Sequence, residues 1–308
     1  MPRVPFRSIA LTAIGMLLLA ACGQSPGDPR GSSGSQDEQV LSVGAIPDQD
    51  PQELQRRYGT LADYLKEKVG VDVKYVPVTD YTASVTAFRR GDLQLVFFGG
   101  LTGVQARTQV SGAIPLAQRD IDADFRSVFI ANTKTGIEPF DDLDGLKELA
   151  GHSFTFGSDT STSGRLMPQH FLSEAGMSVD DFSGNPGYSG SHDKTAKLVE
   201  AGTYQTGALN SSVWDELVKA DKIDTSKVRE VFRTPPYHDY HWVARPDIDD
   251  QLGEGTTDKI KQALLDLDGS DATEKKILDM FQAGSFVDTA PGNYAQIEQV
   301  AQRLGLLN

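Results

Sequence analysis

The first part of the chain alternates between two hydrophobic patterns. Short runs in which every second residue is apolar predict strands, and longer runs with apolar residues three and four apart predict helices. In 53–69, Leu54, Leu61 and Leu65 fall on one helical face, and Gly70 ends the pattern. This order is typical of a mostly parallel sheet covered by helices. The predicted strands lie at 40–46, 71–78 and 93–98, and the helices at 53–69, 82–90 and 101–109.

The same alternation continues with shorter segments. Strands are predicted at 113–118, 127–132, 153–156, 207–210 and 228–233, with helices at 141–149, 168–175, 193–201 and 213–220. Residues 184–190 are rich in glycine and serine and are predicted as a loop. After residue 244 the pattern predicts only helices, at 257–267, 273–280 and 295–306. The pattern therefore predicts an α/β fold.

A run of hydroxyl residues follows the predicted strand at 153–156. Ser161, Thr162 and Ser163 precede a helical pattern. Pro168 places the helix start near 163–165, because proline lacks an N–H and is tolerated only in a first turn. Free N–H groups, the positive end of the helix dipole and several hydroxyl donors together form an anion site. Ordinary capping of a surface helix is the alternative, but four consecutive hydroxyl residues, 160–163, exceed what one cap needs and favour a ligand site.

The N-terminus has the features of a targeting segment. Arg3 and Arg7 precede an apolar run, 9–21, that is short for a membrane span. Leu19-Ala20-Ala21-Cys22 matches the lipobox of bacterial lipoproteins, and this resemblance implies cleavage before Cys22 and a lipid on its sulfur. A plain secretory signal with a chance cysteine is the alternative. The prediction is a signal peptide at 1–21, then the lipidated cysteine and a flexible tether without large apolar residues at 22–39.

Composition excludes several classes of protein. The formal net charge of -14 argues against binding nucleic acid or an acidic membrane surface. Cys22 is the only cysteine, so no disulfide can form within the chain. The chain has no Gly-x-Ser-x-Gly elbow, no Gly-Lys-Ser/Thr phosphate loop and no Rossmann glycine pattern. We therefore expect neither an enzyme nor a bound cofactor.

A dense group of polar and aromatic residues occupies 237–242. It contains Tyr237, His238, Asp239 and His241. Such a group suits the wall of a ligand cleft. The two histidines and the aspartate are also possible metal ligands, which leaves a metal site as an alternative.

Several motifs follow the lipobox in a fixed order and carry a resemblance to a known family. They are Pro77-x-x-Asp80-Tyr81, Phe88-Arg89-Arg90-Gly91-Asp92-Leu93, Phe97-Phe98-Gly99 and Ser161-Thr162-Ser163-Gly164. Together they resemble the extracytoplasmic substrate-binding proteins of ABC transporters, in the group that binds phosphate, phosphite and phosphonates. A sister group labelled as selenate binders shares Ser191-His192-Asp193 and Pro235-Pro236-Tyr237-His238-Asp239-Tyr240.

The resemblance implies a two-lobed type II periplasmic-binding-protein fold, with mixed sheets flanked by helices and the ligand in the cleft between the lobes. Residues 40–125 plus 241–308 would form lobe 1, and 126–240 lobe 2. The protein would be a solute receptor that delivers a small tetrahedral oxyanion to an ABC permease. It would work as a monomer, anchored by Cys22 in the periplasm or at the outer cell surface.

The family's contact positions transfer to individual residues of this sequence. Phe98 stands where the phosphonate group tends to carry tyrosine, so a hydroxyl donor is missing there. Tyr237, His238 or His241 could take the place of Asp239, because the local length differs. The ligand-binding residues that the resemblance implies are Tyr81, Phe98, Ser161, Thr162, Ser163, His192, Asn210, Tyr237, His238 and Asp239.

Asp239 bears on which oxyanion is bound. A carboxylate beside a bound anion in a desolvated site is repelled, unless the ligand brings a proton and donates it. Phosphate, phosphite and phosphonates carry such a proton near neutral pH, whereas selenate and sulfate do not. The expectation is therefore a phosphorus oxyanion. Selenate stays an alternative, because a protonated His192, His238 or His241 could neutralise Asp239.

Overall fold

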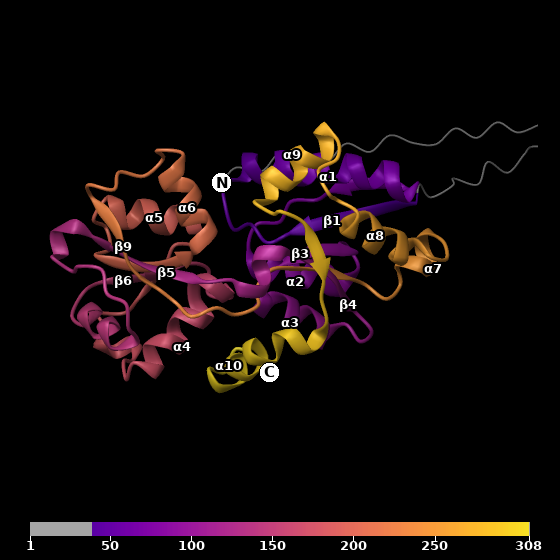
Figure 1. Cartoon of the computed structure of the whole chain (residues 1–308). Helices are drawn as coiled ribbons and strands as arrows, with labels where there is room; N and C mark the ends of the chain where they lie inside the picture. The colour runs from indigo at the N-terminus through magenta and orange to yellow at the C-terminus, as the bar shows by residue number, and fades with distance from the viewer. Residues whose placement is uncertain (1–38, 308) are drawn as a thin grey trace, which may run out of the picture. The chain divides into compact units, whose positions relative to one another are not determined.

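The computed structural model describes residues 39–307 (Figure 1). The predicted signal peptide, Cys22 and the tether up to residue 38 lie outside the described residues. Within the described range, no helix is long and apolar enough to cross a membrane.

The first sheet has six strands in the order β11-β4-β10-β3-β1-β2. Strand β1 pairs in parallel with β2 and β3, whereas β10 runs antiparallel to β3 and β4, and β11 antiparallel to β4. The sheet is thus mixed rather than mostly parallel. Its strands are β1 (Val40–Ala45), β2 (Asp72–Tyr75), β3 (Leu95–Phe98), β4 (Ile114–Arg119), β10 (His241–Ala244) and β11 (Phe286–Asp288). We call this sheet and the helices packed on it the first lobe.

The second sheet has five strands in the order β7-β6-β8-β5-β9. Strand β5 runs antiparallel to both β8 and β9, while β6 is parallel to β7 and β8. Its strands are β5 (Ser127–Asn132), β6 (Phe154–Phe156), β7 (Gly187–Tyr188), β8 (Thr206–Asn210) and β9 (Val228–Arg233). This sheet and its helices are called the second lobe, and the two sheets confirm the predicted mixed α/β fold.

Helices flank both sheets, and local side-chain caps mark the starts of some of them. Asp50 accepts hydrogen bonds from Gln52 N and Glu53 N, and Asp80 accepts one from Ala83 N. On the first lobe lie α1 (Pro51–Val69), α2 (Tyr81–Arg90), α3 (Gly100–Gln109), α7 (Ile248–Leu252), α8 (Thr256–Leu265) and α9 (Ala272–Phe281). On the second lie α4 (Met167–Glu174), α5 (His192–Glu200) and α6 (Ser211–Lys219), with short helical turns η3 (Leu143–Leu149) and η4 (Thr162–Leu166).

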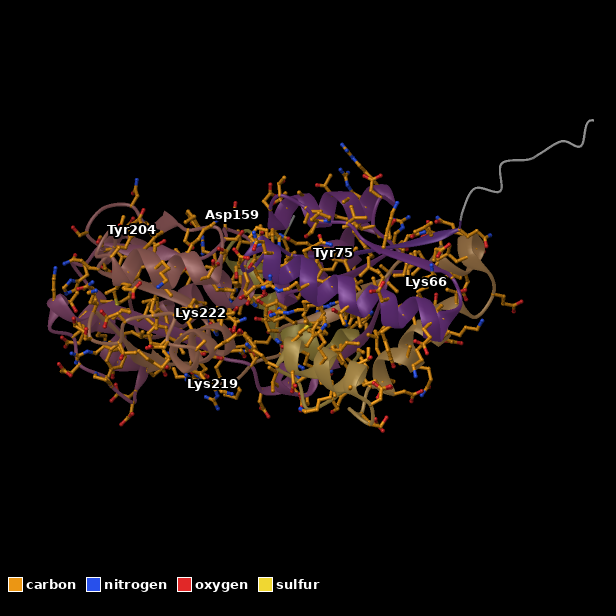
Figure 2. The ribbon with its side chains drawn as sticks, turned by 90° about the horizontal axis from the view of Figure 1, so that it is seen from above. Lys66, Tyr75, Asp159, Tyr204, Lys219 and Lys222 are labelled. Carbon is orange, nitrogen blue, oxygen red and sulfur yellow. The ribbon has the colours of Figure 1, made fainter. Side chains whose placement is uncertain are left out.

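The helix α10 (Ala295–Arg303) contacts α3 of the first lobe as well as η4 and α4 of the second. In Figure 2, Tyr75 and Lys66 mark the first lobe, and Lys219 and Lys222 mark the second. The chain passes between the sheets twice, and Phe125 and Tyr237 of the two crossover segments donate backbone hydrogen bonds to each other at 2.9 Å. The two crossovers are therefore tied together at one point.

Three short strands differ from the sequence-based expectation. The prediction of only helices after residue 244 is wrong, because β11 lies at the edge of the first sheet. The predicted loop at 184–190 contains β7, and the polar aromatic group at 237–242 runs into the buried strand β10. Each is two to four residues long, which is too short to display a period of two, so pairing with a distant strand decides its conformation.

Candidate ligand-binding site

Residues that the sequence singled out stand at helix starts. Tyr81 is the first residue of α2, Thr162 of η4 and His192 of α5, while Asn210 caps α6 through Val213 N. Their side chains are buried. A helix N-terminus presents free N–H groups and about half a positive charge, so several such ends brought together suit an anion. Hydrogen bonds join the helix starts of the two lobes.

The start of α3 is capped from outside its own segment. Gly99 occupies the cap position and has no side chain to offer. Instead, Asp239 Oδ1 accepts a hydrogen bond from Gly100 N at 2.8 Å, and Thr162 Oγ1 accepts one from Leu101 N at 2.9 Å. A Cβ on Gly99 would lie 3.2 Å from Thr162 Oγ1 and 3.3 Å from Asp239 Oδ1, so glycine leaves room for both caps. Because Thr162 belongs to the second lobe, this cap joins the two lobes.

The Asp239 carboxyl is fully buried, and only one of its two oxygens accepts a backbone hydrogen bond. Burial raises its pKa to about 7, against the lowering effect of the hydrogen bond from Gly100 N. Its other oxygen, Oδ2, has no hydrogen-bond partner within residues 39–307. A carboxyl in this state can exchange a hydrogen bond and a proton with a ligand oxygen near neutral pH.

The hydroxyl residues of the second lobe divide into a cap and a free donor. Ser161 Oγ accepts a hydrogen bond from Gly164 N at 3.0 Å, which is ordinary capping. Ser163 Oγ is buried without a partner in the described part of the chain. The Tyr81 hydroxyl is also buried, and burial raises its pKa; Asp48 and Asp239 add to the rise, and the neighbouring Ser161 hydroxyl lowers it. These groups therefore share one buried environment.

Tyr237 lies beside the same hydroxyl residues. Its hydroxyl is 2.6 Å from Ser127 Oγ, which in turn donates to the backbone oxygen of Ser163 at 2.7 Å. Burial raises the pKa of Tyr237; Asp239 raises it further, and the Ser163 hydroxyl lowers it. Tyr237 thus supports the backbone of the hydroxyl run from the crossover.

His192 is held in one tautomer. Asn210 N donates to His192 Nδ1 at 3.3 Å, so the ring proton is placed on Nε2, which lies 3.3 Å from the Tyr240 hydroxyl. Burial lowers the pKa of His192 to about 4, which keeps the ring neutral. The Tyr240 hydroxyl also accepts from Asn210 Nδ2 at 3.1 Å and donates to Asp48 Oδ2 at 2.9 Å. Tyr240 therefore connects both lobes at the crossover.

Three residues of interest lie beside the site rather than in this network. Phe98 is buried against Phe88, with ring centroids 5.5 Å apart. His238 is half-buried, with Nδ1 3.3 Å from Gln118 Oε1. His241 stacks on Tyr294 at 3.8 Å, and burial lowers its pKa to about 3.

Glycine explains how His241 fits behind α3, because a Cβ on Gly103 would lie 2.4 Å from the imidazole ring. His241 Nδ1 lies 3.0 Å from the backbone oxygen of Asp239. In the described part of the chain, no group of three or more His, Cys, Asp or Glu could hold a metal ion. The alternative of a metal site at His238, Asp239 and His241 thus gains no support from their placement.

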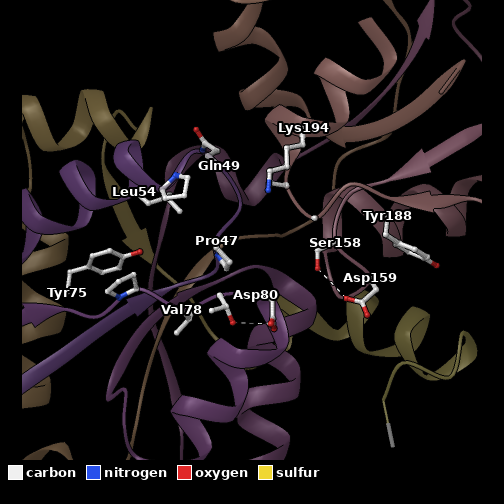
Figure 3. A pocket seen from close by; sticks show the side chains of 15 residues that line it. Pro47, Gln49, Leu54, Tyr75, Val78, Asp80, Ser158, Asp159, Tyr188 and Lys194 are labelled. Atoms are coloured by element: carbon white, nitrogen blue, oxygen red, sulfur yellow. Dashed lines mark hydrogen bonds between the residues drawn. The ribbon is translucent and has the colours of Figure 1, made fainter. Parts of the chain in front are cut away.

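An open cavity of about 730 Å³ lies next to the buried residues (Figure 3). Pro47, Asp80 and Ser191 line it, and each directly precedes a buried residue of the network in the sequence. Figure 3 shows Lys194 and Ser158 of the second lobe facing first-lobe residues across it. The cavity therefore leads from solvent toward the junction of the lobes.

Sequence reasoning missed Asp48 and Ser127, and gave Tyr240 no role of its own. Asp48 stands just after β1, as Gly99 stands just after β3, and the carboxyl ends of neighbouring parallel strands meet at one edge of a sheet. That rule was a usable signal for Asp48. For Tyr240 and Ser127 the sequence carries no comparable signal, because their partners are distant in the chain.

Two mixed sheets flanked by helices and linked by two crossovers are the architecture of periplasmic binding proteins. A family model described as "ABC transporter, phosphonate, periplasmic substrate-binding protein" matches residues 43–294. The chain belongs to this family, as the motifs predicted.

Individual relatives are similar over most of their length. A probable ABC transporter phosphite binding protein, PhnD1 of Prochlorococcus marinus, is 46% identical over 266 residues, 86% of this chain and 90% of that protein. The structure of PhnD1 in complex with methylphosphonate has a TM-score of 0.86 and 45% identity, covering 88% of this chain and 100% of that one. The phosphate-import protein PhnD of Mycolicibacterium smegmatis is 26% identical, over 82% of this chain and 79% of that protein.

Proposed function

We propose that this protein captures a phosphorus oxyanion of the phosphite and phosphonate class outside the cytoplasm and delivers it to an ABC permease. The observation that carries the proposal is the junction at α3, where Asp239 and Thr162 meet beside helix starts of both lobes. The site would bind its ligand with Tyr81, Ser161, Thr162, Ser163, His192, Asn210, Tyr237 and Asp239. The family supports this class of oxyanion, as do the phosphite and methylphosphonate named for its relative PhnD1.

The protonation of the site supports phosphorus over selenium or sulfur. Burial lowers the pKa of His192, His238 and His241, so none of the three is placed to neutralise Asp239 with a positive charge. A ligand that brings its own proton can donate it to Asp239, whereas selenate cannot. The names of the relatives likewise do not favour the selenate alternative.

The remaining features of the receptor belong to the same proposal. Lobe 1 would comprise 40–125 plus 241–308 and lobe 2 126–240, bending at the paired crossovers as hinged receptors do. The protein would act as a monomer that releases its ligand unchanged, without catalysis. A lipid on Cys22 would anchor it, so Cys22→Ala should move the protein from the membrane fraction to the soluble fraction. Persistence of that variant in the membrane pellet would exclude the anchor.

Calorimetry of the full chain in detergent tests the function. The titrants are phosphate, phosphite, methylphosphonate, sulfate, selenate and selenite. We expect binding of at least one phosphorus oxyanion at about one ligand per chain, with no competition from selenate. Asp239→Asn should weaken that ligand and spare selenate, because an amide donates where the carboxylate accepts. Tight selenate binding that phosphite and methylphosphonate cannot displace would overturn the proposal.

A further inference from the structure

Asp48 is a second buried carboxyl at the junction of the lobes. It is 4% exposed and directly follows the segment that leaves β1. Its backbone oxygen accepts a hydrogen bond from His192 N at 3.0 Å, and its Oδ2 accepts one from the Tyr240 hydroxyl at 2.9 Å. Asp48 is thus fixed from the second lobe and from the crossover at once.

The other oxygen of the Asp48 carboxyl, Oδ1, is buried and lacks a hydrogen-bond partner among residues 39–307. Burial raises the pKa of Tyr81 and of Tyr240, and Asp48 and Asp239 both add to that rise, so the two carboxyls lie near the same pair of hydroxyls. A buried polar atom without a partner is costly, and a bound ligand is the natural source of that partner.

The charged groups around Asp48 do not outweigh the effect of its burial on the pKa. Arg119 is engaged by Asp122, with contacts of 2.7 Å from Nε and 2.6 Å from Nη2. Burial raises the pKa of Asp48 and is the largest effect, while Arg57, the hydrogen bond from Tyr240 and Arg119 lower it. His192 is neutral, since burial lowers its pKa to about 4. The titratable groups that face Asp48 are Arg57 and Tyr58 on α1, Tyr75 at the end of β2, Tyr81, Arg119, His192 and Tyr240.

We propose that Asp48 binds the ligand as a neutral carboxylic acid that donates its Oδ1–H to a ligand oxygen, while Asp239 accepts the ligand's own proton. This inference rests on the proposed function. A phosphite or phosphonate monoanion has a single acidic hydrogen, which Asp239 can accept. A second carboxylate would find no hydrogen to accept and would face the anion unshielded. The neutral acid removes that repulsion and turns the free oxygen into a donor.

The proposal makes binding take up a proton. With the lobes apart, Asp48 would be solvated and ionised at neutral pH, so closure on the ligand would draw about one proton from the buffer onto Oδ1. Affinity should therefore fall as pH rises above neutrality, in addition to the effect of the ligand's own ionisation. The two carboxyls would have opposite roles, with Asp48 as donor and Asp239 as acceptor.

The test compares Asp48→Asn with Asp48→Ala in the full chain in detergent. Asparagine reproduces the neutral acid, because its amide N–H can donate to the ligand while its oxygen accepts from Tyr240. Methylphosphonate is titrated in buffers of different ionisation enthalpy, which gives the protons taken up per ligand. Asp63→Asn, an exposed carboxyl on α1, is the matched control for the loss of one charge.

We expect Asp48→Asn to bind methylphosphonate within about threefold of the unmodified protein and to take up about one proton fewer on binding. Asp48→Ala should bind it at least about tenfold more weakly than the unmodified protein. Unchanged proton uptake in Asp48→Asn, or an affinity as low as that of Asp48→Ala, would overturn the proposal. If the unmodified protein binds none of the oxyanions, the proposed function itself fails, which is a different result.

Infrared spectroscopy of the unmodified protein and of Asp48→Asn gives a second check, because it detects protonated carboxyl groups directly. At about pH 8, Asp239 is mostly ionised, since burial raises its pKa only to about 7. Addition of methylphosphonate should then produce a protonated-carboxyl band. Absence of that band would contradict a neutral Asp48, and its presence in the Asp48→Asn variant would assign it to another group.

Discussion

Thr162 Oγ1 accepts a hydrogen bond from the backbone N–H of Leu101 at 2.9 Å. The hydroxyl lies in the second lobe and the N–H at the start of α3 in the first, so one side chain caps a helix across the junction. Gly99 makes this necessary, because it offers α3 no side-chain cap. Contact between the lobes and the capping of α3 are thereby linked in a single residue.

Two replacements of Thr162 should separate the contribution of its side-chain volume to ligand affinity from that of its hydroxyl group. Thr162→Val keeps the volume and removes the hydroxyl, so it should weaken ligand binding about tenfold to a hundredfold, as loss of a hydrogen bond to a charged partner does. Thr162→Ser keeps the hydroxyl and should stay within about threefold. Calorimetry measures both. Wild-type affinity in Thr162→Val would show that neither a ligand contact nor the cap of α3 by this hydroxyl contributes to binding.

Ser161 and Ser163 should respond differently to alanine. Ser163 Oγ has no partner in the described chain, so Ser163→Ala should leave the melting temperature unchanged while weakening binding about tenfold or more. Ser161 Oγ caps Gly164 N, so Ser161→Ala should cost about 1 kcal/mol of folding stability. Thermal unfolding and calorimetry on each variant separate the two roles. A destabilised Ser163→Ala with unchanged affinity would contradict a ligand contact.

His192 should make stability depend on pH. Its pKa falls from an ordinary 6.5 to about 4 on burial, so the unfolded chain binds more protons between these values. The stability that neutral His192 provides is complete above about pH 6.5 and is lost as pH falls toward 4. The loss should reach about 3 kcal/mol, at about 1.4 kcal/mol per pKa unit.

The effect of His192 has to be measured against His192→Gln. Burial raises the pKa of Asp48 and Asp239, so these two groups make stability fall as pH rises over the same range, which is opposite to the effect of His192. Urea unfolding of both proteins from pH 7 down to 4 gives the difference as a function of pH, in steps of about half a unit. That difference should narrow as pH falls. A constant difference would mean that His192 does not titrate on unfolding.

A surface ion pair should contribute only a little to closure. Lys222 Nζ of the second lobe lies 2.8 Å from Glu53 Oε1 of the first, and both side chains are partly exposed. Such pairs contribute about 0.2–1 kcal/mol and are screened by salt, so Lys222→Ala should weaken binding at most about fivefold at low salt and not at high salt. Lys219→Ala on the same side of the second lobe is the control (Figure 2). A large, salt-independent effect would indicate a role beyond the ion pair.

Local sequence determined the helices and most strands. The apolar face predicted for α1 is buried, and the strands at 127–132 and 228–233 have the predicted bounds. It also placed the hydroxyl run at a helix start, because capping and proline rules act within a few residues. The motif order gave the family, since the same residues recur in the same succession.

Only the tertiary structure decided which helix starts meet. The caps that Asp239 and Thr162 provide to α3 join residues 139 and 61 positions apart in the chain. The roles of Asp48 and Tyr240 likewise depend on a hydrogen bond across 192 positions. The protonation of Asp239 and His192 also depends on the tertiary structure. Burial shifts the pKa of both, and burial exists only in the packed molecule. Hydrophobic periodicity and capping by a helix's own preceding residue are local, whereas desolvation, strand pairing and the cap of α3 are set by segments that are distant in the sequence.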